Sequence, residues 1–191
     1  MKKISEVKLF EGKWLTFVES KYQNNRGEHF AWEHIKRRNT GPGVVVVAQL
    51  VPSNRFVLIK QYRPSLEGYI IGFPAGLSDG DPRHALKELK EETGYTGRIR
   101  DISPMLKSNS GIANDSAYIV CAEIDEHHPK NKNPQQHLEP AEVIEVFLIH
   151  PEKVERFLKT QINKGALVAA NLWYFFVLSK IFLKTREKKV A

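Results

Sequence analysis

The chain has 191 residues, of which 41% are hydrophobic and 27% are charged, and its formal net charge is +7. This composition is typical of an ordinary globular protein with ample apolar material for a core. The single cysteine, Cys121, excludes an internal disulfide and a cysteine-based zinc cluster.

The positive charge fits an anionic substrate such as a phosphate ester. Part of the excess lies in KTREKKVA at the C-terminus, which is typical of a solvated tail. A basic chain would also fit nucleic acid, but the signatures of RNA- and DNA-binding modules do not occur in the sequence. We therefore expect no nucleic-acid partner.

The first 38 residues are predicted to form a strand hairpin. Residues 5–19 alternate loosely between apolar and polar side chains, and the turn-rich YQNNRGEH leads into a second alternating run, HFAWEHIKRR. NTGPG at residues 39–43 then marks a break. We expect a hairpin appendage over residues 1–40 and a larger domain over residues 41–191.

Three strands are predicted next, in VVVVAQLV, RFVLIKQYR and GYIIGFP, and the first two are joined by the turn PSN. After one helix, further strands are predicted in GRIRDISPML, DSAYIVCAEID and VIEVFLIH. Cys121 lies in an alternating run, so we expect a buried, inert thiol. Pro151 opens a second helix, and a final buried helix is predicted over residues 167–184. This order indicates an α+β layer sandwich.

The helix after the third of these strands has clear ends and an acidic face. Asp81 suits the N-cap, Pro82 the first helical position and Gly94 the residue after the last. Three carboxylates lie on one helical face and are called the helix glutamates: Glu88, Glu91 and Glu92. Like charges at these spacings repel by about 0.2–0.5 kcal/mol per pair, so either water screens them or a cation lies among them. A solvated acidic face and a magnesium site are both open on spacing alone.

The most apolar segment, residues 165–179, is shorter than the roughly 20 residues that span a bilayer. The N-terminal MKKISEVKLFEGKW has no apolar stretch of the kind found in signal peptides. We therefore expect a cytoplasmic protein without a membrane partner.

The helix and the turn before it resemble the signature of the Nudix hydrolases. In one-letter code the signature is G-x5-E-x7-R-E-U-x-E-E-x-G-U, where U is a bulky apolar residue, and GFPAG followed by KELKEETGY matches its metal-binding part. The resemblance implies a Nudix-type α/β/α sandwich with a mixed sheet, to which the N-terminal β-hairpin is added. It also implies that the helix glutamates and the backbone carbonyl of Ala75 bind Mg²⁺, for which Mn²⁺ could substitute.

The sequence departs from this signature in its loop. Lys87 stands in place of the arginine, and Gly76 and Gly94 are eighteen positions apart, fewer than in the family. Asp79 or Asp81 must replace the first glutamate of the signature, and we expect one of them to pair with Lys87. Lysine lacks the planar fork of arginine, so this brace should be weaker.

Three further segments, VLIKQYRP, IGFPAGL and FAWEHIKR, resemble the ADP-ribose pyrophosphatase branch of the family. The branch places Trp32 against the nucleobase across a dimer, and Arg63, Ala75 and Gly76 beside the diphosphate. Two other interpretations remain open, in which Trp32 packs the hairpin on the main sheet and Arg63 is a plain exposed residue. The branch also places residues 108–118 over the terminal ribose, although an ordinary connector is equally open. Gly72 replaces a glutamate of the branch, which could change the sugar that is accepted.

The general base implied by the branch is a glutamate on a loop before the last strand. Glu142 fits the pattern better than Glu139, and Glu145 is discounted because it lies inside the strand. Glu91 is included with Glu142 and Glu139 among the catalytic candidates. Solvated loop carboxylates are the other interpretation. His127 and His128 lie in the preceding loop without a nearby third ligand, so we expect no metal site there.

The function that the resemblance implies is Mg²⁺-dependent hydrolysis of the diphosphate bond in ADP-ribose or a related nucleoside diphosphate sugar. The products are a nucleoside monophosphate and a sugar phosphate, and the protein is expected to be a homodimer. Two alternatives stay open. One is a non-catalytic sensor of nucleotide sugars, and the other is a Nudix hydrolase of a dinucleotide or a capped substrate.

Overall fold

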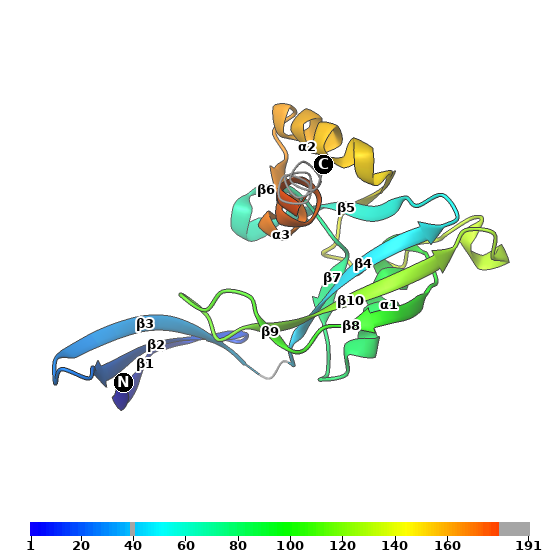
Figure 1. Ribbon diagram of the computed structural model, residues 1–191. Coiled ribbons are helices and arrows are strands. Elements are labelled where there is room, and N and C mark those ends of the chain that lie inside the picture. Colours follow the sequence, from blue (N-terminus) through cyan, green and yellow to red (C-terminus); the bar gives the residue numbers. More distant parts are fainter. Residues whose placement is uncertain (39–40, 180–191) are drawn as a thin grey trace, which may run out of the picture.

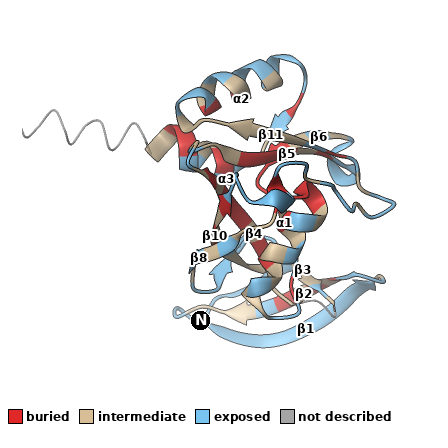
Figure 2. Cartoon of the chain, turned by 90° about the vertical axis from the view of Figure 1, so that its right-hand side faces the viewer, coloured by how far each residue is buried: buried red, intermediate tan, exposed pale blue. Residues whose placement is uncertain are grey.

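The computed structural model describes residues 1–38 and 41–179, which form two separate sheets (Figure 1). The N-terminal sheet contains β1 (Lys2–Glu11), β2 (Leu15–Gln23) and β3 (His29–Arg37), paired antiparallel in the order β1-β2-β3. It is called the appended sheet. It extends away from the body of the molecule, and every residue of β1 is exposed (Figure 2).

The appended sheet has one strand more than the predicted hairpin. The pairing of β2 with β3 was foreseen, but residues 5–19 are two strands and not one. The chain turns back at Gly12, whose N–H donates to the carbonyl of Leu15 at 2.8 Å. A glycine inside a weakly alternating run is compatible with a turn as well as with a strand, and here the turn is formed.

The body is built on a mixed sheet of nine strands within the described residues. The central order is β12-β6-β5-β4-β10-β8, while β11 pairs with β5, β7 with β4 and β9 with β10. The bounds are β4 (Gly43–Val51), β5 (Phe56–Arg63), β6 (Gly68–Gly72), β7 (Ala75–Leu77), β8 (Arg98–Ile102), β9 (Leu106–Lys107), β10 (Ser116–Asp125), β11 (Ile144–Ile149) and β12 (Leu167–Val168). β4 runs parallel to β10, and β5 runs antiparallel to β6 and β11. The strands predicted in this part of the chain are confirmed.

Helices cover both faces of this sheet, so the predicted α/β/α sandwich is confirmed. On one face α1 (Ala85–Thr93) buries Ala85 and Leu89 against Val44, Val46 and other residues of β4 and β10. On the other face α2 (Val154–Asn163) and α3 (Ala170–Trp173), with the π-helical turn Tyr174–Leu178, pack on Leu58, Ile71 and Phe73. β4 serves both cores because its side chains alternate between the two faces. The buried strands between these layers are visible in Figure 2.

The ends of α1 follow the prediction. The Asp81 side chain accepts the N–H of Arg83 at 2.9 Å and caps a 3-10 turn, Pro82–His84, that leads into the helix. Gly94 ends it with φ +77°, and its N–H donates to the carbonyl of Lys90. Such a left-handed residue is the usual place for glycine.

The last predicted helix begins later than expected. Leu167 and Val168 form β12, which pairs parallel with Ile70 and Ile71 of β6, so they belong to the sheet. The helix starts at Ala170, and residues 180–184 of the prediction lie outside the described residues. A pair of apolar residues is compatible with a strand as well as with a helix. Here β6 has an edge available for pairing, so Leu167 and Val168 form a strand.

Within the described residues, the structure has no helix that is both long and apolar enough to cross a membrane. Cys121 lies in β10 and is partly buried, and burial raises the pKa of its thiol.

Candidate active site

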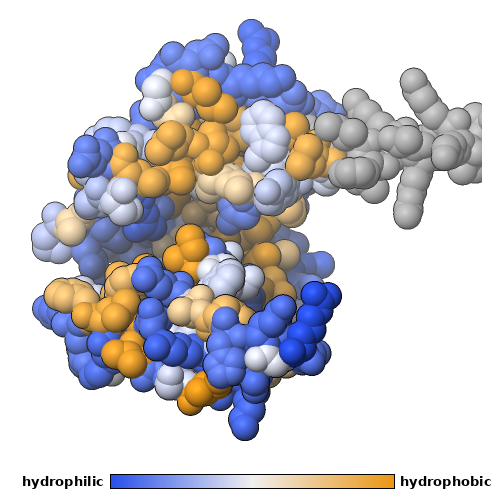
Figure 3. Space-filling view, turned by 90° about the vertical axis from the view of Figure 1, so that its left-hand side faces the viewer, coloured by the Kyte–Doolittle hydropathy of each residue, from blue (hydrophilic) through white to orange (hydrophobic). Residues whose placement is uncertain are grey.

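A cleft of about 1070 Å³ opens between the body and the base of the appended sheet. The hollow is visible between the upper and lower parts of the surface in Figure 3. Acidic and basic side chains both line it. The acidic ones are Asp79, Glu88, Asp115, Glu139 and Glu142, and the basic ones are Arg37, Arg63, His84, Lys87 and Lys107. Ala75, Gly76 and Leu77 of β7 also belong to its wall. The cleft thus offers sites for a cation and for an anion.

Glu88 is held against the backbone of β7. A Cβ atom added at Gly76 would lie 2.1 Å from Cδ of Glu88 and 2.3 Å from each of its carboxylate oxygens. Only a residue without a side chain leaves room for a carboxylate at that distance. Burial, and then the charge of Glu91, raise the pKa of Glu88.

Glu92 lies behind the cleft wall. It is 2% exposed, and its Oε2 accepts the N–H of Ala75 at 3.0 Å. Burial raises the pKa of Glu92 to about 8, although the hydrogen bond from the Ala75 N–H by itself lowers that pKa. Among the described residues, the positive charge of Arg63 lowers this pKa but does not offset the burial.

Glu91 forms an ion pair along the helix. Unlike Glu88, it is not among the residues that line the cleft, and its Oε2 lies 3.7 Å from Nζ of Lys87 on the same helix. Among the described residues, neither Asp79 nor Asp81 forms an ion pair with Lys87, because Asp81 pairs with Arg83 at 3.0 Å. The predicted brace was therefore wrong. An (i, i+4) partner was available to Lys87 at lower cost than one across the loop.

The first residues of the loop 134–142, residues 134–137, contact the C-terminal end of α1. A Cβ atom added at Gly94 would lie 2.4 Å from the backbone nitrogen of Gln135, so the loop touches the glycine directly. The N–H of His137 donates to the carbonyl of Glu91 at 2.8 Å, and Nε2 of Gln136 donates to the carbonyl of Glu92 at 2.6 Å. The free carbonyls of the helix end are thus satisfied by the loop.

This loop brings two carboxylates to the cleft. Glu139 and Glu142 both line it, and the N–H of Glu139 donates to Oε2 of Glu142 at 2.9 Å. The charge of Glu142 raises the pKa of both Glu88 and Glu92, which places the three carboxylates in one electrostatic cluster. Glu145 lies in β11, 3.7 Å from Lys60, outside the cleft lining.

Arg63, at the end of β5, lines the cleft and also a second pocket of about 320 Å³ beside it. Ala75 lies at the junction of the two cavities, and Gly72 lines the second one. A Cβ atom at Gly72 would meet Ala169 at an ordinary 3.6 Å. The glycine therefore leaves this pocket open without being required by the backbone.

Trp32 does not line the cleft of its own chain. Its side chain is 50% exposed, and its indole N–H donates to the carbonyl of Gly111 at 3.2 Å. The structure thus places it against residues 108–115, and the alternative interpretation, in which Trp32 packs the hairpin on the main sheet, is not seen. Ser108, Asn114 and Asp115 of that segment do line the cleft.

Arg37 and Lys107 were not singled out from the sequence, although both line the cleft. Arg37 lies inside the quoted FAWEHIKR, but a basic residue at a strand end gives no local sign of what it faces. The same holds for Lys107, since the two-residue strand that carries it is defined by its pairing with β10.

The donor set fits a hard divalent cation. Carboxylate and backbone oxygens are the ligands that Mg²⁺ prefers, and Glu88 and Glu92 have raised pKa values because buried negative charge is not offset. Among the described residues, no three side chains of His, Cys, Asp or Glu converge closely enough to hold a metal by themselves. Mg²⁺ does not need such a cage, because it keeps several waters and binds one or two carboxylates together with substrate phosphates.

Comparison with known proteins gives a consistent result. The chain is 30% identical over 181 residues to an uncharacterized Nudix hydrolase of Schizosaccharomyces pombe, covering 90% of this chain and 88% of that protein. It is 32% identical over 153 residues to the ADP-sugar pyrophosphatase of Mus musculus, covering 75% and 70% of the two chains. It is 33% identical over 152 residues to the ADP-ribose pyrophosphatase of Saccharomyces cerevisiae, covering 74% and 66%.

A solved structure described as an ADP compounds hydrolase shares the fold. The TM-score is 0.58 at 18% identity, and the match covers 86% of this chain and 96% of that one. The chain matches no family model.

Proposed function

The chain belongs to the Nudix hydrolase family, and on this premise we propose that it hydrolyses the diphosphate bond of ADP-ribose or a related nucleoside diphosphate sugar with Mg²⁺ as cofactor. The products are a nucleoside monophosphate and a sugar phosphate. One observation carries the proposal: a single cleft holds Glu88, Glu139 and Glu142 together with Arg63. The names of the relatives from mouse and yeast support this substrate class.

Glu88, Glu91 and Glu92 would hold the cation, with the backbone carbonyl of Ala75. When bound, Mg²⁺ supplies positive charge against the diphosphate oxygens and lowers the pKa of a nearby water. The bond from Ala75 N–H to Glu92 fixes that carboxylate relative to β7, so the ligands are arranged before substrate arrives.

Arg63 and the loop carboxylates act on the substrate. Arg63 donates hydrogen bonds to the diphosphate from the end of β5, where it reaches both the cleft and the second pocket. Glu142 accepts the proton of the attacking water, with Glu139 as the other candidate base. The residues thus contribute chiefly by position and by charge.

Trp32 stacks on the nucleobase of a substrate that is bound in a partner's cleft. Its indole is half exposed and does not face the cleft of its own chain, which is the arrangement that a homodimer needs. Indole faces are suited to flat π-systems such as adenine.

The direct test is to incubate the protein with a panel of nucleoside diphosphate sugars and Mg²⁺ and to identify the products. We expect a nucleoside monophosphate and a sugar phosphate from ADP-ribose, and no product with EDTA. Tight binding without any monophosphate over hours would instead identify a nucleotide-sugar sensor.

A further inference from the structure

Part of the cleft wall is bonded to the appended sheet. Residues 108–115, called the wall loop, connect β9 to β10. The N–H of Ile35 in β3 donates to the carbonyl of Ile112 at 2.8 Å, and the N–H of Asn114 donates to the carbonyl of Ile35 at 3.3 Å. A parallel bridge also joins Ile35 to Ala113. β3 is an edge strand, so the wall loop pairs with backbone groups that its own sheet leaves open.

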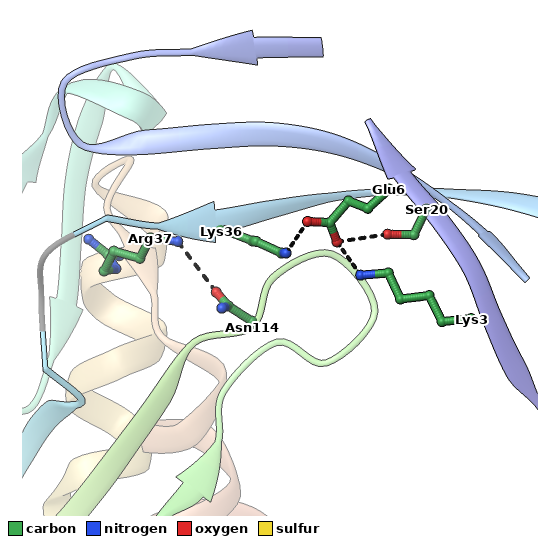
Figure 4. A network of polar contacts seen from close by, with 6 residues as sticks. All are labelled: Lys3, Glu6, Ser20, Lys36, Arg37 and Asn114. Carbon is green, nitrogen blue, oxygen red and sulfur yellow. Dashed lines mark hydrogen bonds and ion pairs between the residues drawn. The ribbon is translucent and has the colours of Figure 1, made fainter. Parts of the chain in front are cut away.

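Arg37 of β3 adds to this pairing through its side chain and through its backbone N–H. The guanidinium of Arg37 holds the Asp115 carboxylate with two bonds, from Nε to Oδ1 at 3.2 Å and from Nη2 to Oδ2 at 3.4 Å. The backbone N–H of Arg37 donates to Oδ1 of Asn114 at 3.3 Å (Figure 4). A fork of this kind fixes orientation as well as distance.

The strand that carries Arg37 is itself tied to its neighbours. Glu6 of β1 accepts bonds from Lys36 of β3, from Lys3 and from Ser20 of β2 (Figure 4). Lys3, followed by Lys36, lowers the pKa of Glu6 to about 2, so this carboxylate is charged at neutral pH. The end of β3 therefore offers a fixed surface for the wall loop.

The two ends of the wall loop are held differently from its tip. At the base, Nζ of Lys107 donates to Oγ of Ser116 at 2.8 Å, and the N–H of Ser108 donates to the carbonyl of Asp115 at 3.3 Å. These bonds stay within the β9–β10 hairpin. The tip forms the bonds to β3, and within the loop the N–H groups of Ile112 and Ala113 donate to the carbonyl of Asn109 at 3.2 and 2.8 Å. Loss of the β3 contacts would leave the hairpin base intact and release the tip, together with the side chains of the cleft residues Asn114 and Asp115.

We propose that Arg37 and Asp115 are positioning residues: their ion pair docks the wall loop on β3 and so fixes one wall of the substrate cleft. The appended sheet then sets substrate affinity within its own chain, separately from any contact with a second copy. This inference rests on the proposed function. It goes further by assigning roles to residues that touch neither the cation ligands nor the proposed base.

The test is a double-mutant cycle with a structural measurement beside it. Arg37→Ala, Asp115→Ala and the double variant are compared in ADP-ribose hydrolysis with Mg²⁺, and hydrogen exchange is followed at the amides of Ile35 and Asn114. We expect each single variant to raise KM about tenfold, equivalent to about 1.4 kcal/mol, with kcat nearly unchanged. The double variant should be no worse than either single one, because both remove the same contact. Exchange should be faster in all three.

Arg38→Ala is the matched control. Arg38 follows Arg37 in the chain, but its Nη1 bonds Glu11 at 2.7 Å and the carbonyl of Gly12 at 2.9 Å, inside the appended sheet. It should change neither KM nor the exchange of Ile35 and Asn114. An equal rise in KM for this variant would mean that the sheet as a whole had loosened, and the proposal would be overturned.

Other outcomes also decide the matter. If Arg37 binds substrate directly and Asp115 only neutralises it, Asp115→Ala lowers KM, and the proposal is wrong. Additive effects in the double variant, or unchanged exchange at Asn114, overturn it too. If wild-type protein hydrolyses none of the nucleotide sugars, the proposed function fails, while the exchange measurement still decides whether the ion pair docks the loop.

Discussion

The Glu92 carboxylate, in a residue that is 2% exposed, accepts the backbone N–H of Ala75 at 3.0 Å. This bond joins α1 to β7 at the wall of the cleft. One carboxylate therefore belongs both to the proposed cation site and to the packing of the helix, so we expect its charge to affect activity as well as stability.

Glu92→Gln should lower turnover of ADP-ribose by at least about a hundredfold, since an amide cannot supply the charge of a carboxylate to a cation. The fold should persist, because the amide oxygen can still accept the Ala75 N–H and repulsion on the helix is relieved. Steady-state kinetics and circular dichroism measure the two effects. Glu152→Gln, at a side chain that is 86% exposed, is the control. Near-normal activity in folded Glu92→Gln protein would contradict the assignment of Glu92 as a cation ligand.

The metal-free protein should lose stability as the pH rises. The pKa of Glu92 is about 8 in the folded state against an ordinary value of 4.5, so between these values the folded state binds the extra proton. Stability from this group is present below pH 4.5 and is lost as the pH rises through 8, by at most about 1.4 kcal/mol per pH unit.

Urea unfolding in EDTA at pH 5.5 and at pH 7.5 measures this change. Glu92→Gln removes the titrating group, so its free energy of unfolding should fall less between the two pH values than that of the wild type. Parallel behaviour of the two proteins would show that Glu92 titrates normally.

Glu142→Gln should cut kcat sharply and leave KM nearly unchanged, because the base acts chiefly in the transition state. Glu139→Gln should do much less, although both residues line the cleft. Reversed effects would move the base to Glu139, and no effect from either would assign water activation to another group.

Gly76→Ala should damage the site through Glu88. The added methyl would lie 2.1 Å from the carboxyl carbon of Glu88, so that side chain must move away from β7. We expect weaker cation binding, measured with Mn²⁺ by electron paramagnetic resonance, and lower kcat. At Gly68 a Cβ atom has its nearest neighbour at 3.5 Å, so Gly68→Ala should bind Mn²⁺ like the wild type. Equal binding by both variants would contradict the contact.

The protein should sediment as a dimer at micromolar concentration. The appended sheet exposes Phe10 by 68%, Trp14 by 60% and Trp32 by 50%, which is more aromatic surface than a small sheet usually leaves open. Deletion of residues 1–38 should give a monomer or an aggregate. A wild-type monomer under these conditions would refute the assembly and, with it, the role of Trp32 in a partner's cleft.

The sequence predicted correctly those structural features that depend on a few neighbouring residues. Asp81 and Gly94 marked the ends of α1 because capping depends on a few neighbouring residues. Gly12 and the pair Leu167–Val168 were misassigned, because a turn and a two-residue strand are chosen by the surrounding structure.

The site shows the same division. The spacing of the helix glutamates showed that they share one helical face, but the contact of Glu88 with Gly76 and the ion pair of Asp115 with Arg37 join segments far apart in the sequence. Lys87 illustrates the opposite error. A distant partner was expected for it, and its neighbour Glu91, one helical turn away, is the partner that the structure shows.

The close contact between the backbone of Gln135 and Gly94 limits how this site can be transferred to another protein. At other helix ends an asparagine can take the left-handed conformation, but here any side chain would enter the backbone of the following loop. A protein engineer who moves α1 into another scaffold must therefore move residues 134–137 with it. The helix and the loop that carries the candidate base form one transferable unit, and neither half would retain its geometry alone.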